Sequence, residues 1–229
     1  MEERVRQILT DLERVRENLL ALSDDIWLSI DHNDQDALLE GVEFKRIYNE
    51  KMAQLNSTAT GLSALIQKFT DVPLEQPITG GPHRNGTTEN ERIIRELNRE
   101  TQHTLDEDFS YKRPYGFVLD GQAYQEILTW RGLYELLGRQ LSIKDGARFR
   151  DLPNNPHFIS KRGNKSFANS PADLRFPLEI AAGVYAEGNL SANNIRDNIK
   201  HLLQEFGIDP QTFVIYLRED RDALADTQV

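Results

Sequence analysis

Three short runs place basic side chains next to aromatic ones, a combination that can contact nucleic acids. They occupy residues 111–115, 148–150 and 161–167. Lysine and arginine can neutralise phosphates while aromatic faces stack on bases. The candidate contact residues are Lys112, Arg113, Arg148, Arg150, Lys161, Arg162 and Lys165. In the alternative interpretation, Phe149, Phe158 and Phe167 fill the core and the charges only solvate the loop that spans residues 144–177.

Acidic residues offer a second kind of chemistry. Asp106, Glu107 and Asp108 are consecutive, and an apolar-periodic stretch carries Glu43 close to Lys45, a carboxylate–lysine pair of the kind that nucleases use. On a helix, however, such acid–base pairs are the ordinary solvated face. No two of the five histidines are four residues apart, and cysteine is absent. The sequence therefore predicts no catalytic residue, metal site or cofactor, and a metal-dependent nuclease is the least favoured alternative.

The elements that would position these residues begin with a heptad repeat near the N-terminus. Its apolar residues alternate at spacings of three and four, and they are Val5, Ile8, Leu12, Val15, Leu19, Leu22 and Ile26. This is the a/d pattern by which one helix packs against another. The intervening residues, among them Arg16 and Glu17, are expected to form a solvated face of mixed charge.

A second helix is predicted over about residues 35–69, after a polar turn at 31–35. Apolar side chains recur every seven residues along it, at Tyr48, Leu55, Leu62 and Phe69. Two such helices joined by a short turn predict an antiparallel hairpin over residues 1–70. Because two helices bury little surface, we expect this hairpin to form a homo-oligomer or to bind a protein partner. Packing against the rest of the chain is the alternative.

Residues 71–90 are rich in proline and glycine and read as a flexible linker. A domain over residues 91–229 follows, with a leading helix over about 88–104. Asp120-Gly121 is the favoured two-residue hairpin turn, and a helix is expected over 125–141. Strands are expected at 178–186, interrupted by Gly183, and at 213–217, with a helix between them that begins after Ser191 and ends at Gly207. The fold class is therefore α+β, with a coiled-coil-like hairpin followed by a small α+β domain.

Charge is distributed unevenly along the chain. Residues 1–109 contain 12 Lys and Arg against 22 Asp and Glu, whereas residues 110–185 contain 11 basic and 7 acidic residues. The acidic first half opposes general nucleic-acid coating, and the basic middle still permits a local contact. The chain contains no long apolar run and no recognisable leader. With no cysteine, these features predict a cytoplasmic protein without a membrane partner.

The second half resembles a module of poorly characterised bacterial proteins that accompany restriction and other defence genes. The resemblance rests on Tyr115-Gly-Phe-Val-Leu, on Asn189-Leu-Ser-Ala-Asn and its flanks, and on Phe213-Val-Ile-Tyr-Leu. It implies a bacterial or phage setting and an accessory role, and it assigns no catalytic residue.

Together these observations predict a non-enzymatic adaptor, or accessory subunit, of a bacterial multiprotein system. The hairpin would serve for assembly of the system, and the α+β domain would serve for recognition of a binding partner. The main alternative is a dimeric DNA- or RNA-binding regulator that uses the basic loop over residues 144–177.

Overall fold

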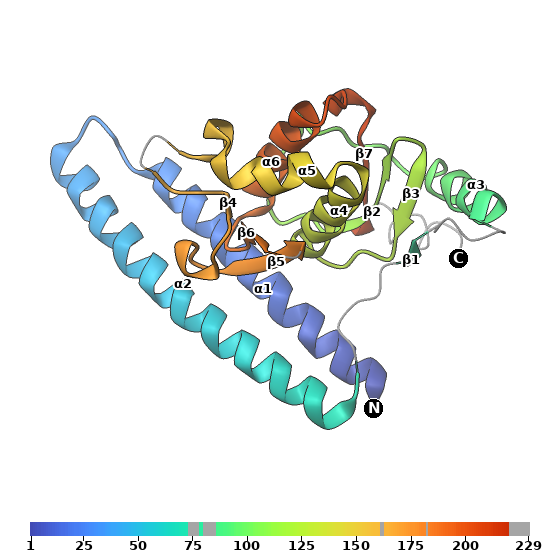
Figure 1. Ribbon diagram of the computed structural model, residues 1–229. Coiled ribbons are helices and arrows are strands. Elements are labelled where there is room, and N and C mark those ends of the chain that lie inside the picture. The colour runs from blue at the N-terminus through green and yellow to red at the C-terminus, as the bar shows by residue number, and fades with distance from the viewer. Residues whose placement is uncertain (73–77, 80–85, 161–162, 182, 220–229) are drawn as a thin grey trace. The chain divides into compact units, whose positions relative to one another are not determined.

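The computed structural model describes most of the chain and divides it into two compact units (Figure 1). The described residues are 1–72, 78–79, 86–160, 163–181 and 183–219. The first unit comprises Met1–Leu74 together with Asn189–Ser191, and the second comprises Glu75–Gly188 together with Ala192–Val229. Long N-terminal helices followed by a sheet-containing region confirm the predicted α+β class.

The first unit is built on helices α1 (Glu2–Ser29) and α2 (Gln35–Thr70), which run antiparallel as predicted (Figure 1). The turn between them ends at Asp34, whose side chain accepts hydrogen bonds from the backbone N–H groups of Asp36 and Ala37. This N-cap satisfies amides that have no partner within the helix, and so fixes where α2 begins.

The larger sheet of the second unit has the strand order β1-β3-β2-β7, and all its pairings are antiparallel. Its strands are β1 (Ile78–Thr79), β2 (Pro114–Leu119), β3 (Gln122–Gln125) and β7 (Val214–Leu217). The predicted turn between β2 and β3 is confirmed. Asp120 and Gly121 both have positive φ, 50° and 74°, as the two-residue hairpin turn requires.

The smaller sheet has the order β4-β6-β5, with strands β4 (Phe167–Ala168), β5 (Pro177–Ala181) and β6 (Val184–Glu187). β5 and β6 form an antiparallel hairpin in which Glu179 faces Tyr185. Gly183, with a φ of 78°, lies between them, at the interruption that the sequence predicted. Its positive φ is a conformation that glycine adopts without a steric cost.

The helices of the second unit are α3 (Gly86–Leu97), α4 (Trp130–Lys144), α5 (Gly146–Asp151) and α6 (Ala192–Glu205). Short 3-10 turns punctuate the chain at Leu152–Asn154, Pro156–Phe158, Pro171–Asp173 and Pro210–Thr212. α6 follows Ser191 and ends before Gly207, which has a φ of 68°, as expected. Among the described residues, no helix combines the length and the apolar character needed to cross a bilayer.

Two predicted helix boundaries were wrong. The helix expected over 125–141 begins only at Trp130, because Gln125 ends strand β3 and the Thr129 hydroxyl accepts a hydrogen bond from the N–H of Gly132 as an N-cap. Helix α3 ends at Leu97 and does not reach residue 104. The chain turns there so that His103 can pair with Ile215, a strand contact that is invisible to local periodicity.

The predicted linker over 71–90 contains β1 and the first residues of α3. The remainder of its Pro- and Gly-rich part, residues 73–77 and 80–85, lies outside the described residues.

Aromatic side chains form the core of the second unit. Phe117 stacks on Tyr124 and on Phe213, with ring centroids 4.5 Å and 5.1 Å away. Phe149, Phe158 and Phe167 are also buried, and the rings of Phe149 and Phe158 each pack edge to face against Phe167. Offset and edge-to-face pairs of this kind contribute beyond the area that they bury. These phenylalanines therefore fill the core, as the alternative interpretation of the basic–aromatic runs predicted.

Gly116, in the block Tyr115-Gly-Phe, allows a close approach between strands β2 and β3. A Cβ atom at this position would lie 2.5 Å from the carbonyl oxygen of Tyr124. We therefore expect Gly116→Ala to lower the free energy of unfolding by about 1–3 kcal/mol, because β2 and β3 must separate to admit the methyl group. Gly146→Ala is the matched control, since nothing lies within 4 Å of its Cβ position. Urea unfolding of both variants measures the difference, and equal stabilities would contradict the prediction.

Candidate assembly surface

Polar side chains of α2 tie the two helices of the hairpin together. The ammonium group of Lys45 lies 2.7 Å from the hydroxyl of Ser23 and 2.9 Å from Oδ1 of Asp24. The hydroxyl of Tyr48 donates to the backbone carbonyl of Leu19 at 2.8 Å. These contacts identify the side of each helix that faces the other, and they set the antiparallel register. Lys45 therefore joins the two helices of the hairpin, while Glu43 accepts a hydrogen bond from the guanidinium of Arg46 at 2.7 Å.

A segment distant in sequence completes the first unit. The side-chain amide of Asn56 donates to Oδ1 of Asn189 at 2.8 Å, and the hydroxyl of Ser191 donates to Oδ2 of Asp24 at 3.1 Å. Asn56 and Ser191 are buried. A buried polar group is stabilised only when it is hydrogen-bonded, so these contacts fix the place of Asn189–Ser191. The sequence predicted Ser191 as the residue before a helix, and it contained no signal for this contact.

The apolar residues of the predicted heptad repeat, which we call the seam of α1, separate into two parallel lines. Val5, Leu12, Leu19 and Ile26 are half-buried. The other line is exposed, and its members are Ile8, Val15 and Leu22, at 59%, 50% and 42%. Residues seven apart lie almost above one another on a helix, so each line runs straight along α1.

The buried side of α1 is not centred on the predicted seam but lies about one residue further round the helix. Leu9 and Arg16, which directly follow exposed seam residues, are buried, and so is Glu17. The prediction that Arg16 and Glu17 lie on a solvated face is therefore wrong. Nε of Arg16 lies 3.1 Å from Oε2 of Glu13, and this ion pair compensates the buried guanidinium. Sequence periodicity could not show this, because charge pairs at helical spacing are usual on exposed faces as well.

Helix α2 also carries an exposed apolar line. It consists of Ile47, Leu62, Leu65 and Phe69. Ile47 and Leu65 are 18 residues apart, which is five full helical turns. Leu62, Leu65 and Phe69 are spaced by three and four residues, so they share one side of the helix. Of the residues predicted to repeat every seven along α2, Tyr48 and Leu55 are half-buried, while Leu62 and Phe69 are exposed.

The exposed lines of α1 and α2 belong to one face of the hairpin. On both helices an exposed apolar residue directly precedes a more buried one, as Val15 precedes Arg16 and Leu65 precedes Ile66. Each step of one residue along an α-helix turns the side-chain direction by about 100° about the helix axis, in the same sense for every helix viewed from its N-terminus. Because the helices run antiparallel, that rotation turns both lines towards the same side. We call this surface the apolar face; its members are Ile8, Val15, Leu22, Ile47, Leu62, Leu65 and Phe69.

Most of the described candidates for nucleic-acid contact are held by other groups of the protein. Nε of Arg113 lies 2.6 Å from Oε1 of Glu219, and the ammonium group of Lys165 lies 2.8 Å from Oδ2 of Asp173. The guanidinium of Arg148 donates to the backbone carbonyl of Glu205 at 3.0 Å.

The remaining candidates differ in their surroundings. Nζ of Lys112 lies 5.9 Å from the centre of the Phe109 ring. Arg150 is exposed on α5. Lys161 and Arg162 lie outside the described residues. The ion pairs of Arg113 and Lys165 reduce the positive charge that these two side chains can offer to a phosphate.

The consecutive acidic residues are all bound into local structure. Asp106 accepts hydrogen bonds from Lys200 and Gln211, at 2.8 Å and 2.9 Å. Asp108 accepts from the side-chain amide of Asn193 at 2.7 Å and from the backbone of Ser110 at 3.0 Å. These bonds secure the loop before β2 against helix α6.

Glu107 forms a pair that the sequence reasoning missed. Its Oε2 lies 2.7 Å from Nδ1 of His103, four residues earlier, and its Oε1 accepts the backbone N–H of Thr104 at 2.8 Å. The i,i+4 spacing of His103 and Glu107 was the available signal. Among the described residues there is no group of three or more His, Cys, Asp or Glu side chains that could hold a metal ion.

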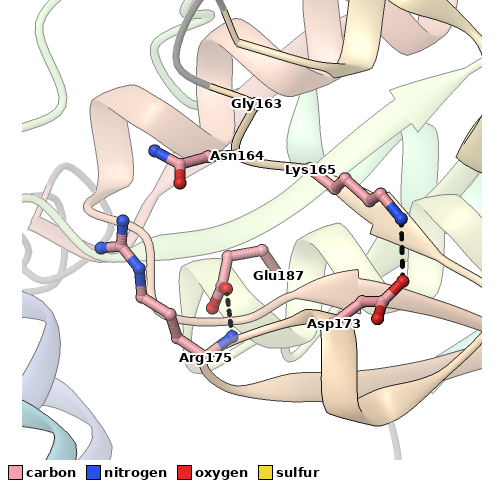
Figure 2. Close-up of a pocket in the computed structure, with 6 residues that line it drawn as sticks. All are labelled: Gly163, Asn164, Lys165, Asp173, Arg175 and Glu187. Atoms are coloured by element: carbon pink, nitrogen blue, oxygen red, sulfur yellow. Dashed lines mark hydrogen bonds and ion pairs between the residues drawn. The ribbon is translucent and has the colours of Figure 1, made fainter.

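A small polar pocket lies beside β6 in the second unit, with a volume of about 260 Å³ (Figure 2). It is lined by Gly163, Asn164, Lys165, Asp173, Arg175 and Glu187. Lys165 is paired with Asp173, and Glu187 accepts backbone N–H groups of Arg175 and Phe176. Figure 2 shows the side chains of Asn164 and Arg175 on the side away from the Lys165–Asp173 pair. The carboxylates of Asp173 and Glu187 balance the positive charges of Lys165 and Arg175, so the lining favours neither an anion nor a cation.

Comparison of the chain with protein-family models, with curated proteins and with solved structures gave no match. The geometry of the apolar face, of the paired charges and of the pocket is therefore the basis for any functional assignment.

The hydrogen bonds of Asp108 predict a dependence of stability on pH. Bonds from Asn193 and Ser110 lower the pKa of Asp108 to about 2, from an ordinary value near 4. Because the pKa is lower in the folded state, its contribution to stability is present above about pH 4 and is lost as the pH falls towards 2. We expect Asp108→Asn to be less stable than the wild type at pH 6 and the difference to shrink between pH 4 and 2. Urea unfolding across this range measures it, and a constant difference would contradict the assignment.

Proposed function

We propose that this protein is a non-enzymatic assembly protein, and that its hairpin associates with a second copy of the chain through the apolar face. One observation carries the proposal. Seven large apolar side chains, between 42% and 81% exposed, lie along a single side of α1 and α2. Several exposed apolar side chains on one side of a helical hairpin are typical of a surface that another helical element covers.

The side of the hairpin that carries the apolar face is large enough for a stable association. Helix α1 has 28 residues and is therefore about 42 Å long, and two adjacent helices span about 20 Å. The product is on the order of 800 Å² for each copy, the usual area of a specific interface. Burying one Leu, Ile or Phe contributes roughly 1.5–3 kcal/mol when it was fully exposed. Several such side chains together can exceed the roughly 4–15 kcal/mol that association costs.

The second unit would then be presented in more than one copy for recognition of other components. The polar contacts of Asp106, Glu107 and Asp108 support a non-enzymatic role, because these carboxylates hold the loop before β2 in place. The resemblance of the second half to a module of defence-associated bacterial proteins supports an accessory subunit in such a system. Pairing of Arg113, Arg148 and Lys165 with other groups weakens the case for the nucleic-acid-binding alternative.

Charge introduced into the apolar face tests the proposal. We expect the full-length protein to sediment as a dimer or larger oligomer at micromolar concentration. Val15→Glu combined with Leu65→Glu should shift it to the monomer and raise the dissociation constant at least tenfold, because the interface would bury unpaired carboxylates. Sedimentation velocity over a concentration series measures this shift, and circular dichroism checks that the helices remain folded.

A matched control changes exposed residues on the opposite side of α2. Ala53→Glu combined with Thr60→Glu adds the same charge outside the apolar face and should leave the mass unchanged. A wild-type protein that remains monomeric at every concentration, or equal weakening by both double variants, would overturn the proposed assembly role.

A further inference from the structure

The polar pocket beside β6 combines charges of both signs (Figure 2). Two cations, Lys165 and Arg175, and two carboxylates, Asp173 and Glu187, contribute to its lining. All its lining residues lie between 163 and 187, within one stretch of the second unit. The pocket is therefore independent of the hairpin and of its proposed association with a second copy.

Hydrogen bonds hold both carboxylates of the pocket in place. Oδ2 of Asp173 accepts from the ammonium group of Lys165 at 2.8 Å. The two side-chain oxygens of Glu187 accept the backbone N–H groups of Arg175 and Phe176, at 2.9 Å and 3.1 Å. A ligand therefore meets carboxylates that are already in position, and little ordering is needed when it binds.

Two donor groups on the other side of the pocket have no partner. Within the part of the chain that the structure describes, neither the guanidinium of Arg175 nor the side-chain amide of Asn164 makes a hydrogen bond or an ion pair. The backbone of Asn164 is bonded, because its N–H donates to the hydroxyl of Ser160 at 3.0 Å and its carbonyl accepts the N–H of Ser160 at 2.8 Å. Figure 2 shows both free side chains on the side away from the Lys165–Asp173 pair. A guanidinium offers two parallel N–H groups, which match the two oxygens of a carboxylate.

Ligands with a single charge fit this lining poorly. An anion can pair with Arg175, but it also approaches the carboxylates of Asp173 and Glu187. A cation attracted by these carboxylates approaches Arg175, and a neutral ligand leaves its guanidinium without a counterion. Like charges that come close cost free energy, whereas complementary charges fix a ligand's orientation. The lining therefore favours a small molecule that carries both charges.

We infer that the pocket binds a free α-amino acid. Its carboxylate lies against Arg175 and Asn164, and its ammonium group is directed towards Asp173 and Glu187. The volume of about 260 Å³ accommodates a small amino acid. The six described lining residues include no apolar side chain that would hold a large one. This inference adds a ligand site to the second unit, and its failure would leave the proposed assembly role untouched.

L-alanine and two ligands that each lack one of its charges test the inference. Propionate lacks the ammonium group, and ethylammonium lacks the carboxylate. We expect L-alanine to shift the backbone amide signals of Gly163 and Asn164 saturably in a ¹⁵N TROSY titration, with a dissociation constant on the order of 1–10 mM for so small a ligand. Each single-charge ligand should bind at least fivefold more weakly. Equal binding by either of them, or no saturable shift with L-alanine, would overturn the inference.

Removal of the free guanidinium tests which group holds the carboxylate. Arg175→Gln keeps the backbone N–H that Glu187 accepts and should weaken L-alanine binding at least fivefold. Arg150→Gln is the matched control, because Arg150 is exposed on α5 and does not line the pocket. The same weakening in both variants, or none in Arg175→Gln, contradicts the assigned role of Arg175.

Removal of one carboxylate provides a test with a gain as well as a loss. Asp173→Asn leaves the lining with two cations and one carboxylate. L-alanine should therefore bind more weakly and propionate more tightly, so that the preference for L-alanine over propionate falls at least fivefold. An unchanged preference would show that Asp173 does not face the ammonium group. Amide signals outside the pocket that keep their positions show that the variant remains folded.

Discussion

The contact between α1 and α2 leaves large apolar side chains exposed on both helices, and this constraint governs the first unit. Lys45 and Tyr48 bond to Ser23 and Leu19 and so determine which sides of the helices meet. Once those sides are chosen, a heptad stripe wider than the contact cannot be fully buried by one partner helix. Four residues of the α1 seam are therefore partly buried and the other three are exposed. The exposed apolar residues Ile47, Leu62, Leu65 and Phe69 of α2 lie on the same side as those of α1, because antiparallel helices turn their exposed lines to one side.

Buried polar groups on the hairpin have a different role. Arg16 is almost fully buried and pairs with Glu13. Asn56 binds Asn189, and Asp24 accepts both Lys45 and Ser191. Such groups are costly to bury unless each finds its partner, so they specify one arrangement more than they add stability. They make the first unit depend on three residues that come more than a hundred positions later in the chain.

Aromatic packing plays the equivalent part in the second unit. The basic–aromatic runs that suggested nucleic-acid contact contribute their phenylalanines to the core, where Phe149 and Phe158 each pack against Phe167. Once the rings are buried they cannot stack on bases. Their basic neighbours Arg148 and Lys165 bond to Glu205 and Asp173. A motif that reads as a binding surface is thus largely accounted for by folding.

Local signals in the sequence were sufficient for the elements whose cause is local. The heptad repeat predicted both long helices, Asp120-Gly121 predicted its hairpin turn, and Gly183 and Gly207 predicted a strand interruption and a helix end, because periodicity and positive φ depend on neighbouring residues only. Tertiary structure alone decided which half of the seam is covered, that Arg16 is buried, that Asn189–Ser191 joins the first unit and that α3 stops at Leu97. Each of these depends on contacts between residues far apart in the chain, whose free energy no local pattern records.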